Sequence, residues 1–175
     1  MSRGWRSESM KRIARFEKVS WEQFLKSWEG REEQEVREIY DQVRLPFRAT
    51  KGSAGYDFFM PESMMIAPGE TKKIPTGIRV YMEEGWVLKI YPRSGLGFKY
   101  RLQLNNTVGI IDSDYYASDN EGHIFIKITN DSNEGKILSL RCGEGFAQGI
   151  FVEYGITFDD QATDIRNGGF GSTTK

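Results

Sequence analysis

The sequence contains one cysteine, Cys142, and one histidine, His123, among its 175 residues. A single cysteine excludes an intrachain disulfide and a cluster of thiolate ligands, and a single histidine excludes a metal site built from several histidines. Any metal ion in this protein is therefore expected to have oxygen ligands. We interpret Cys142 as a small buried or half-buried side chain, and His123 as a partly exposed residue at the start of a strand.

Neither sign of charge is in excess, and long apolar runs are absent. The chain has 24 Lys and Arg residues against 25 Asp and Glu residues, a net charge of -1 that argues against a general nucleic-acid binder. No apolar stretch reaches the length of a membrane span, and the charged N-terminus lacks the apolar core of a signal peptide. With 38% hydrophobic residues, the chain can bury one core. These features predict a cytoplasmic globular protein that binds neither nucleic acid nor membranes.

The N-terminal part has the spacing of amphipathic helices. In SWEQFLKSWEG (20–30), four apolar residues repeat at i, i+3, i+4 and i+7. Ser20 can cap the start of this helix with Gln23 at the third position, and Gly30 can end it. The charged segment REEQEVREIYDQV (31–43) extends the helical region. We expect the aromatic face of 20–30 to dock on the rest of the protein; the alternative is that it recruits a protein partner.

Short strands are expected beyond residue 45, because Gly and Pro interrupt the sequence at short intervals. The segments WVLKIY (86–91), HIFIKIT (123–129) and ILSLR (137–141) alternate apolar and polar residues, which is typical of half-buried strands. Short, evenly spaced strands favour a sandwich or a barrel. We therefore predict an all-β protein.

The composition along the chain predicts three parts. Residues 1–40 form a partly helical N-terminal extension, and residues 41–165 form the β domain. The last ten residues, 166–175, contain three glycines and one aromatic residue, so they cannot form a packed element by themselves. We expect them to be a flexible tail.

Four separated segments place glycine beside small hydroxyl or charged side chains at expected strand ends. They are GSAGYD (52–57), PRSGLG (92–97), GEGFAQG (143–149) and RNGGFGST (166–173). Exposed backbone amides together with guanidinium groups are the donors that hold the anionic oxygens of a polyphosphate. Each segment alone is more typical of a glycine-rich turn, so one such segment is a weak indication.

A fifth segment, NNTVGIIDSDYYASDNEGH (105–123), differs because an apolar strand ends in two acidic residues. Asp112 and Asp114 follow that strand, and Tyr115 comes next. A carboxylate at a strand end, close to a phosphate-binding loop, can orient and deprotonate a water molecule. On turn statistics alone, an Asp-rich hairpin turn is the more frequent explanation of this pattern.

In this order, the five segments resemble the five motifs of the trimeric deoxyuridine triphosphatase (dUTPase) family. The similarity begins at LPFRATKGSAGYDFF (45–59) and continues to Thr174. It implies a jelly-roll-like β-clip subunit that assembles as a homotrimer with three active sites at subunit interfaces. It also implies hydrolysis of dUTP to dUMP and pyrophosphate with Mg2+, which limits uracil in DNA and supplies dUMP for dTMP synthesis.

On the phosphate side, the resemblance assigns five residues of this chain. Asp57 would bind Mg2+ through water and help to position the phosphates. Arg93, Ser94 and Gly95 would hold the triphosphate, and Gln148 from the fourth motif would contact it as well. Mg2+ prefers octahedral oxygen ligation with retained waters, so a site without a His or Cys cluster suits this metal.

On the nucleoside side, the resemblance assigns residues of the third motif. The uracil edge would be read by Asn106 and by the backbone around Gly109, Ile110 and Ile111. Tyr115 would stack against the deoxyribose and leave no room for a 2′-hydroxyl. Asp112 would orient the water that attacks the α-phosphorus. A site built for the uracil hydrogen-bond pattern rejects cytosine, which presents an amine in place of a carbonyl oxygen.

The tail carries four further residues that the resemblance assigns to the active site of another subunit. Arg166 would reach the γ-phosphate, and Phe170 would cover the uracil ring. Gly171 and Ser172 would add phosphate donors. Only Asn167 separates Arg166 from the GGFG sequence, whereas many family members have two residues there.

Two other parts of the chain depart from the family pattern. The segment YASDNEG (116–122) lengthens the hairpin after Tyr115, and residues 1–40 have no counterpart in the minimal family member. An alternative function is an interaction or regulatory protein that uses one of these parts to bind another protein. The related dCTP deaminases are a second alternative, but they rely on a catalytic glutamate, and the IDSDY and GGFGST sequences argue against them.

Overall fold

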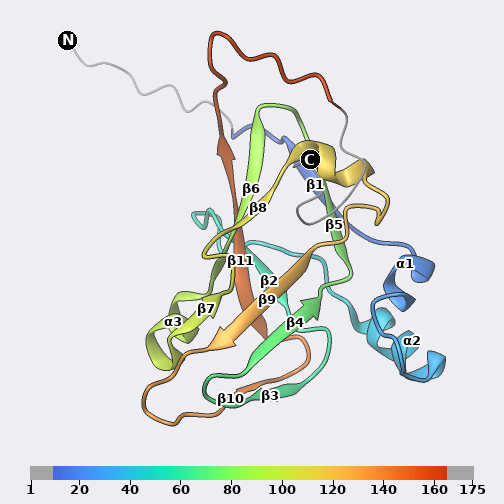
Figure 1. The fold of residues 1–175 in the computed structure, drawn as a ribbon, viewed down its shortest axis with the longest axis vertical. Helices are drawn as coiled ribbons and strands as arrows, with labels where there is room; N and C mark the ends of the chain where they lie inside the picture. The colour runs from blue at the N-terminus through green and yellow to red at the C-terminus, as the bar shows by residue number, and fades with distance from the viewer. Residues whose placement is uncertain (1–9, 165–175) are drawn as a thin grey trace.

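The structure, a computed structural model, describes residues 10–164 and consists mainly of short antiparallel strands (Figure 1). The strands are β1 (Ala14–Lys18), β2 (Tyr56–Phe59), β3 (Met64–Ile66), β4 (Thr71–Pro75), β5 (Ile78–Met82), β6 (Trp86–Pro92), β7 (Leu102–Leu104), β8 (Gly109–Ile111), β9 (Phe125–Asn130), β10 (Leu138–Leu140) and β11 (Gly145–Glu153). The helices are α1 (Trp21–Leu25), α2 (Glu33–Gln42), α3 (Ser94–Tyr100) and the 3-10 helix η1 (Ser113–Ala117). The all-β prediction is confirmed.

Within residues 10–164 the strands form four sheets, and two of these have more than two strands. The larger has four strands in the order β2-β11-β6-β8, and the second has three in the order β4-β9-β7. In Figure 1, β4 and β9 run diagonally across β11. Both sheets supply fully buried apolar side chains, including Phe58, Leu88 and Ile90 from the first and Ile74, Ile126 and Ile128 from the second. Burial of this apolar surface is the main stabilising term of the fold.

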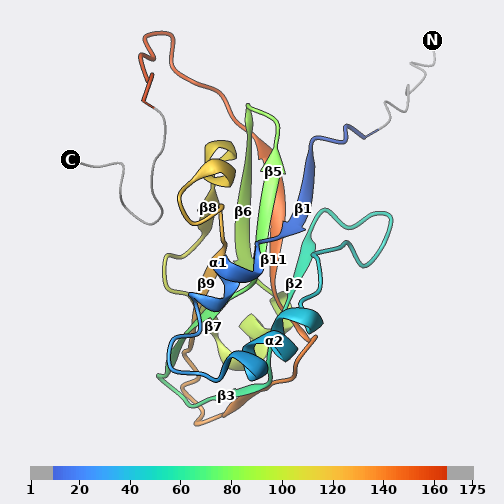
Figure 2. The same ribbon diagram turned by 90° about the vertical axis from the view of Figure 1, so that its right-hand side faces the viewer.

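The N-terminal helices lie on one side of the molecule, at the right of Figure 1 and facing the viewer in Figure 2. Phe24 in α1 and Val36 in α2 are fully buried and belong to the same core cluster as the strands. The prediction that the aromatic face docks on the protein is therefore confirmed for Phe24 and for Trp28, which is buried as well. The helix α1 is shorter than predicted and ends five residues before Gly30.

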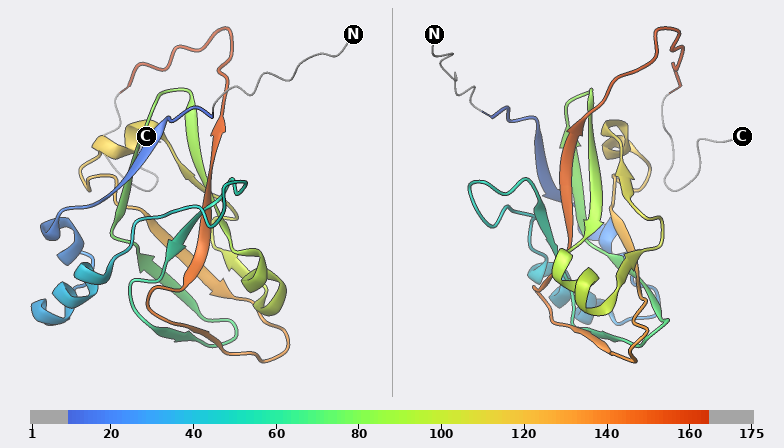
Figure 3. Two further views of the ribbon diagram at one scale, coloured as in Figure 1. Left: turned by 180° about the vertical axis from the view of Figure 1, so that it is seen from behind. Right: turned by 90° about the vertical axis from the view of Figure 1, so that its left-hand side faces the viewer.

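The strand β1 was not predicted. It pairs in antiparallel register with β5, from Ala14 opposite Met82 to Lys18 opposite Ile78. The views in Figure 3 show β1 beside the upright strands of the molecule. Only Ala14 and Phe16 are apolar in this strand, so its alternation is shorter than in the segments that were predicted. Only pairing with β5 gives these residues a regular structure.

The three alternating segments form the strands β6, β9 and β10, as predicted. The second glycine-rich segment does not form a simple turn: after Arg93 the chain enters α3, which contains Gly95 and Gly97. Two glycines disfavour a helix by about 1 kcal/mol each relative to alanine, so tertiary packing must offset them. The partly buried Leu96 and Tyr100, which pack on the core cluster, are the side chains that do so.

In residues 10–164, no helix has the length and apolar character needed to cross a membrane.

Candidate active site

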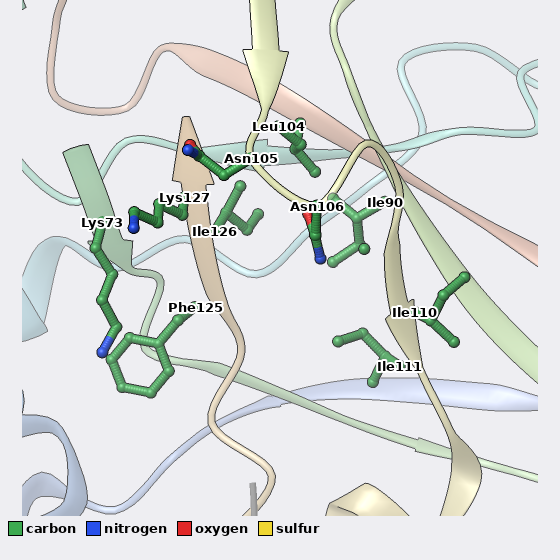
Figure 4. A pocket seen from close by; sticks show the side chains of 11 residues that line it. Lys73, Ile90, Leu104, Asn105, Asn106, Ile110, Ile111, Phe125, Ile126 and Lys127 are labelled. Atoms are coloured by element: carbon green, nitrogen blue, oxygen red, sulfur yellow. The ribbon is translucent and has the colours of Figure 1, made fainter. Parts of the chain in front are cut away.

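A cavity of about 440 Å3 opens between β8 and β9 (Figure 4). Ile110 and Ile111 of β8 line one side of it, and Phe125 and Lys127 of β9 line the other. Asn106, from the connection between β7 and β8, also borders it. The residues that the resemblance assigns to uracil are thus brought together: Asn106, Gly109, Ile110 and Ile111 all line this one cavity.

The strand β8 offers its backbone to this cavity because it is an edge strand. Among the described strands it pairs only with β6, with Gly109 opposite Ile90. An edge strand leaves alternate N–H and C=O groups on one side without ladder partners, so they can pair with a planar ring that carries donors and acceptors. Residue 109 must be small here, since a Cβ atom would lie 3.0 Å from the Cβ of Ile90.

Sequence reasoning missed several residues of the cavity. Lys73, Phe125 and Lys127 line it, and the Lys73 ammonium lies 4.3 Å from the centroid of the Phe125 ring. The alternation of HIFIKIT places residues 125 and 127 on one face of a strand. That pattern does not say which face borders a cavity, because the neighbouring strand β4 is distant in sequence.

Asp57, Arg93 and Gln148 form a second polar cluster, drawn from the first, second and fourth motifs. The Arg93 Nε atom lies 3.4 Å from Asp57 Oδ1. Gln148 lies directly opposite Asp57 in the pairing of β11 with β2, and its Nε2 donates to the Pro92 carbonyl at 3.2 Å. A Cβ atom at residue 145 would lie 2.9 Å from Arg93 Nη1, so the guanidinium would have to shift. The exposed Ser94 and Gly95 follow Arg93 at the start of α3.

The cavity and this cluster lie on opposite faces of the four-stranded sheet. Gln148 is opposite Asp57 and Tyr91, whereas its neighbour Gly149 is opposite Ile90, which lines the cavity. Successive residues of a strand point to opposite faces, so Asp57 and Gln148 point away from the face that carries Ile90. Within one chain, the cavity and the polar cluster therefore face in different directions.

Asp112 stands at the end of the strand that lines the cavity. It follows Ile111 directly, has an extended backbone and precedes η1. Asp112 is partly exposed, and Asp114 is exposed. A carboxylate in this place is accessible to water next to any ligand that the cavity holds.

Tyr115, in contrast, is only 5% exposed, and its hydroxyl has two hydrogen-bond partners. Its hydroxyl donates to the His123 carbonyl at 2.7 Å and accepts from Asn120 Nδ2 at 2.8 Å. The hydroxyl of Ser118 donates to the Tyr115 carbonyl. The ring is therefore fixed in orientation before any ligand binds.

The family model described as dUTPase matches residues 41–174. The chain belongs to the dUTPase family. It is 44% identical over 134 residues to the deoxyuridine 5′-triphosphate nucleotidohydrolase of Lactococcus lactis subsp. lactis, which covers 75% of this chain and 88% of the relative. The enzyme of the same name from Haemophilus influenzae is 41% identical over 145 residues, which is 78% of this chain and 91% of the relative.

The fold agrees with this family. The crystal structure of dUTPase from Streptococcus mutans superposes with a TM-score of 0.62 at 33% identity, and it covers 81% of this chain and 97% of that one. The predicted jelly-roll-like β-clip subunit is therefore confirmed.

The assigned tail residues Arg166, Phe170, Gly171 and Ser172 lie outside the described residues.

The expectation of a partly exposed His123 is wrong: the residue has no exposed surface and precedes β9. Its Nε2 accepts from the Gly77 amide at 2.9 Å, and its Nδ1 lies 3.3 Å from the Ser27 hydroxyl. The Gly77 bond requires an unprotonated Nε2, which places the proton on Nδ1. Sequence alone could not reveal this burial, because α1 and the Gly77 turn that cover the ring are far from residue 123 in the chain.

Burial lowers the pKa of His123 from 6.5 to about 4; the nearby Glu121 charge opposes this shift and Lys73 adds to it. The unfolded chain takes up a proton near pH 6.5 that the folded chain does not take up until about pH 4. The stability from the neutral ring is therefore fully present above pH 6.5 and is lost as the pH falls toward 4. Between pH 7 and pH 5 we expect the free energy of unfolding to decrease by about 2 kcal/mol.

Urea unfolding at fixed protein concentration tests this expectation, with His123→Gln as the control. The glutamine can accept from the Gly77 amide but does not titrate. Since the chain has one histidine, the variant should lose most of the pH dependence between pH 7 and pH 5. Equal slopes in the two proteins would show that His123 is not buried in its neutral form.

Residues that could hold a metal are few. In residues 10–164, no group of three or more His, Cys, Asp or Glu side chains is arranged to hold a metal ion. Asp57 is the acidic member of the polar cluster, and its carboxylate is 19% exposed. This donor set fits Mg2+, which usually keeps several waters and binds through one or two carboxylates together with substrate phosphates.

Proposed function

We propose that the protein is a cytoplasmic dUTP diphosphatase that hydrolyses dUTP to dUMP and pyrophosphate, which limits uracil in DNA and supplies dUMP for dTMP synthesis. The observation that carries this proposal is the position of Asp112. The residue directly follows the edge strand β8, which lines the cavity with Gly109, Ile110 and Ile111. A base bound along β8 brings its sugar and α-phosphate toward that carboxylate.

Uracil binds in the cavity between β8 and β9. Its ring carbonyls and N3–H pair with the backbone groups of β8 and with the Asn106 side chain, while Ile111 and Phe125 line the cavity around it. A ring amine in place of a carbonyl leaves a donor against a donor, which costs far more than the loss of one apolar contact. Tyr115 packs beneath the deoxyribose, where its fixed ring leaves no space for a 2′-hydroxyl.

The phosphates bind to the polar cluster of Asp57, Arg93 and Gln148 and to the donors of Ser94 and Gly95. The Arg93 guanidinium already faces a carboxylate oxygen at 3.4 Å, so it is oriented toward anions. dUTPases generally depend on Mg2+. Asp57 would hold this ion through water, and the ion would neutralise phosphate charge when bound. Arg166, Phe170, Gly171 and Ser172 would complete the site from another subunit's tail.

A homotrimer allows one nucleotide to contact the cavity of one chain and the polar cluster of another. Because one chain directs its cavity and its polar cluster to opposite faces, a nucleotide that uses both is best placed between two chains. Closed cyclic assemblies repeat such a heterologous contact around the ring and give one site for each interface. Three chains thus give three equivalent sites.

In the reaction, the oxygen of a water molecule attacks the α-phosphorus. The Asp112 carboxylate accepts a proton from this water molecule as the attack takes place. The bond between the α-phosphorus and the bridging oxygen breaks, and pyrophosphate leaves with that oxygen in line with the attacking water. Arg93 and the backbone donors stabilise the charge that develops on the phosphate oxygens.

A substrate panel tests the proposed function. Purified protein is incubated with dUTP, dCTP, dTTP or UTP in the presence of Mg2+, and pyrophosphate and the nucleoside product are measured. We expect pyrophosphate from dUTP only, with dUMP as the second product. Release of ammonia from dCTP, or no pyrophosphate from dUTP, would contradict the proposal.

A further inference from the structure

The two parts of the chain that depart from the family pattern contact each other. The N-terminal extension precedes the residues that the family model matches, and the hairpin insert, residues 116–122, lies inside them. The 3-10 helix η1, which contains the start of the insert, packs against β5, the strand that pairs with β1. Both parts are far apart in sequence, so their contacts are long-range tertiary interactions rather than local turn structure.

The first contact joins the start of α1 to Glu121 of the hairpin insert. Glu121 Oε2 accepts from the Ser20 backbone amide at 2.8 Å, and Oε1 accepts from the Ser20 hydroxyl at 2.6 Å. Ser20 in turn caps α1, since its hydroxyl accepts from the Gln23 amide. In a capping box the third helical residue would bond the cap amide. Here the carboxylate of a residue 101 positions away does so.

A second contact joins β1 to the start of the hairpin insert. The Tyr116 hydroxyl donates to Glu17 Oε2 at 2.7 Å. Arg79 of β5 supports the same residue: its guanidinium lies 3.7 Å from the centroid of the Tyr116 ring, and Nη2 donates to the Tyr116 carbonyl at 2.9 Å. The insert is thus held at both of its ends by the N-terminal extension and its partner strand.

The third contact connects the extension to the nucleotide cavity. The His123 ring, which lies against Ser27 and 6.2 Å from Phe24 by ring centroids, also contacts Phe125 at 4.3 Å between centroids. Phe125 lines the cavity. The carbonyl of His123 accepts from the Tyr115 hydroxyl. A rigid His123 therefore sets the positions of both aromatic rings.

We infer that the N-terminal extension positions the nucleoside-binding side of the active site, by holding the hairpin insert and His123 through Glu17, Ser20 and Ser27. This inference rests on the proposed function, because Tyr115 and Phe125 are taken to contact the sugar and the base. The three residues of the extension are positioning residues: they contact the hairpin insert or His123, and they act on the nucleotide only through Tyr115 and Phe125.

The test is Ser20→Asp, measured in the full-length protein. Aspartate still caps α1 but places a second carboxylate beside Glu121, so the helix is kept while the contact becomes repulsive. We expect the ratio of kcat/KM for dUTP to that for UTP to fall about fivefold, a typical size for coupling between contacting elements. The amides of Glu121 and His123 should exchange hydrogen faster.

Two further variants separate positioning from loss of stability. Adding Glu121→Gln to Ser20→Asp removes the repulsion and should restore the dUTP-to-UTP ratio to within about twofold of wild type. Arg31→Gln is the matched control: it breaks the bidentate pair of Arg31 with Glu62, which ties the same extension to the β domain away from the insert. This variant should leave the ratio unchanged.

The outcomes are distinguishable from failure of the proposed function. If wild-type protein does not hydrolyse dUTP, the proposed function is wrong. If it does, and folded Ser20→Asp keeps the wild-type ratio, the inference is wrong. Should Ser20→Asp not fold, Tyr116→Phe removes only the bond to Glu17. An unchanged ratio and unchanged exchange at residues 116–123 in that variant would overturn the inference.

Discussion

Replacement of Asp112 by asparagine is expected to lower kcat for dUTP at least about a hundredfold with little change in dUTP affinity. General-base catalysis typically contributes about 10² to 10⁴ in rate. Asparagine has nearly the same shape and suits the extended backbone that precedes η1, so the fold should be retained. It cannot accept a proton from water, however, and this is the step assigned to the carboxylate.

The matched control is Asp114→Asn, which removes a carboxylate two residues later, inside η1. Its side chain is exposed, and the mechanism gives it no role. We expect turnover within about threefold of wild type, as for most surface substitutions. Single-turnover assays and dUTP binding separate kcat from affinity. Near-wild-type turnover in Asp112→Asn would show that Asp112 is a structural turn residue.

The second large effect is the recovery of activity when two inactive variants share a trimer. Arg93→Gln removes the phosphate-binding guanidinium and should lower kcat/KM about thirtyfold or more, as for the loss of a charged contact at an interface. Asp112→Asn removes the base. If the cavity of one chain faces the polar cluster of another, a mixed trimer contains sites in which both residues are intact.

Random mixing of equal amounts gives an intact site about one time in four, so co-expressed variants should show about a quarter of the wild-type activity. Co-expression of wild type with Asp112→Asn should give about half of the wild-type activity, which checks that the two chains are made in equal amounts. Light scattering on the same samples should give a trimer. Activity no greater than the residual of the separate variants would show that each site is built within one chain.

The sequence by itself determined the fold class and the chemistry-bearing segments. Alternation predicted β6, β9 and β10, because an antiparallel strand with one buried face has an apolar residue at every second position. The order of the five motifs indicated the family, and four residues assigned to uracil line one cavity. Each strand pattern and each motif is local, so a short window of the sequence contains it, and only the order of the motifs uses the whole chain.

Tertiary structure decided what depends on contacts between distant segments. Residues 94–100 became α3 despite two glycines, and His123 became fully buried, because packing against other segments outweighed the local pattern. The same holds for β1, which needs β5 as its partner. The opposite directions of Ile90 and Asp57 follow from the register of β11 with two neighbours, and the bond of Glu121 to Ser20 spans 101 residues. Register and burial of this kind depend on the whole chain at once, so no window of the sequence contains them.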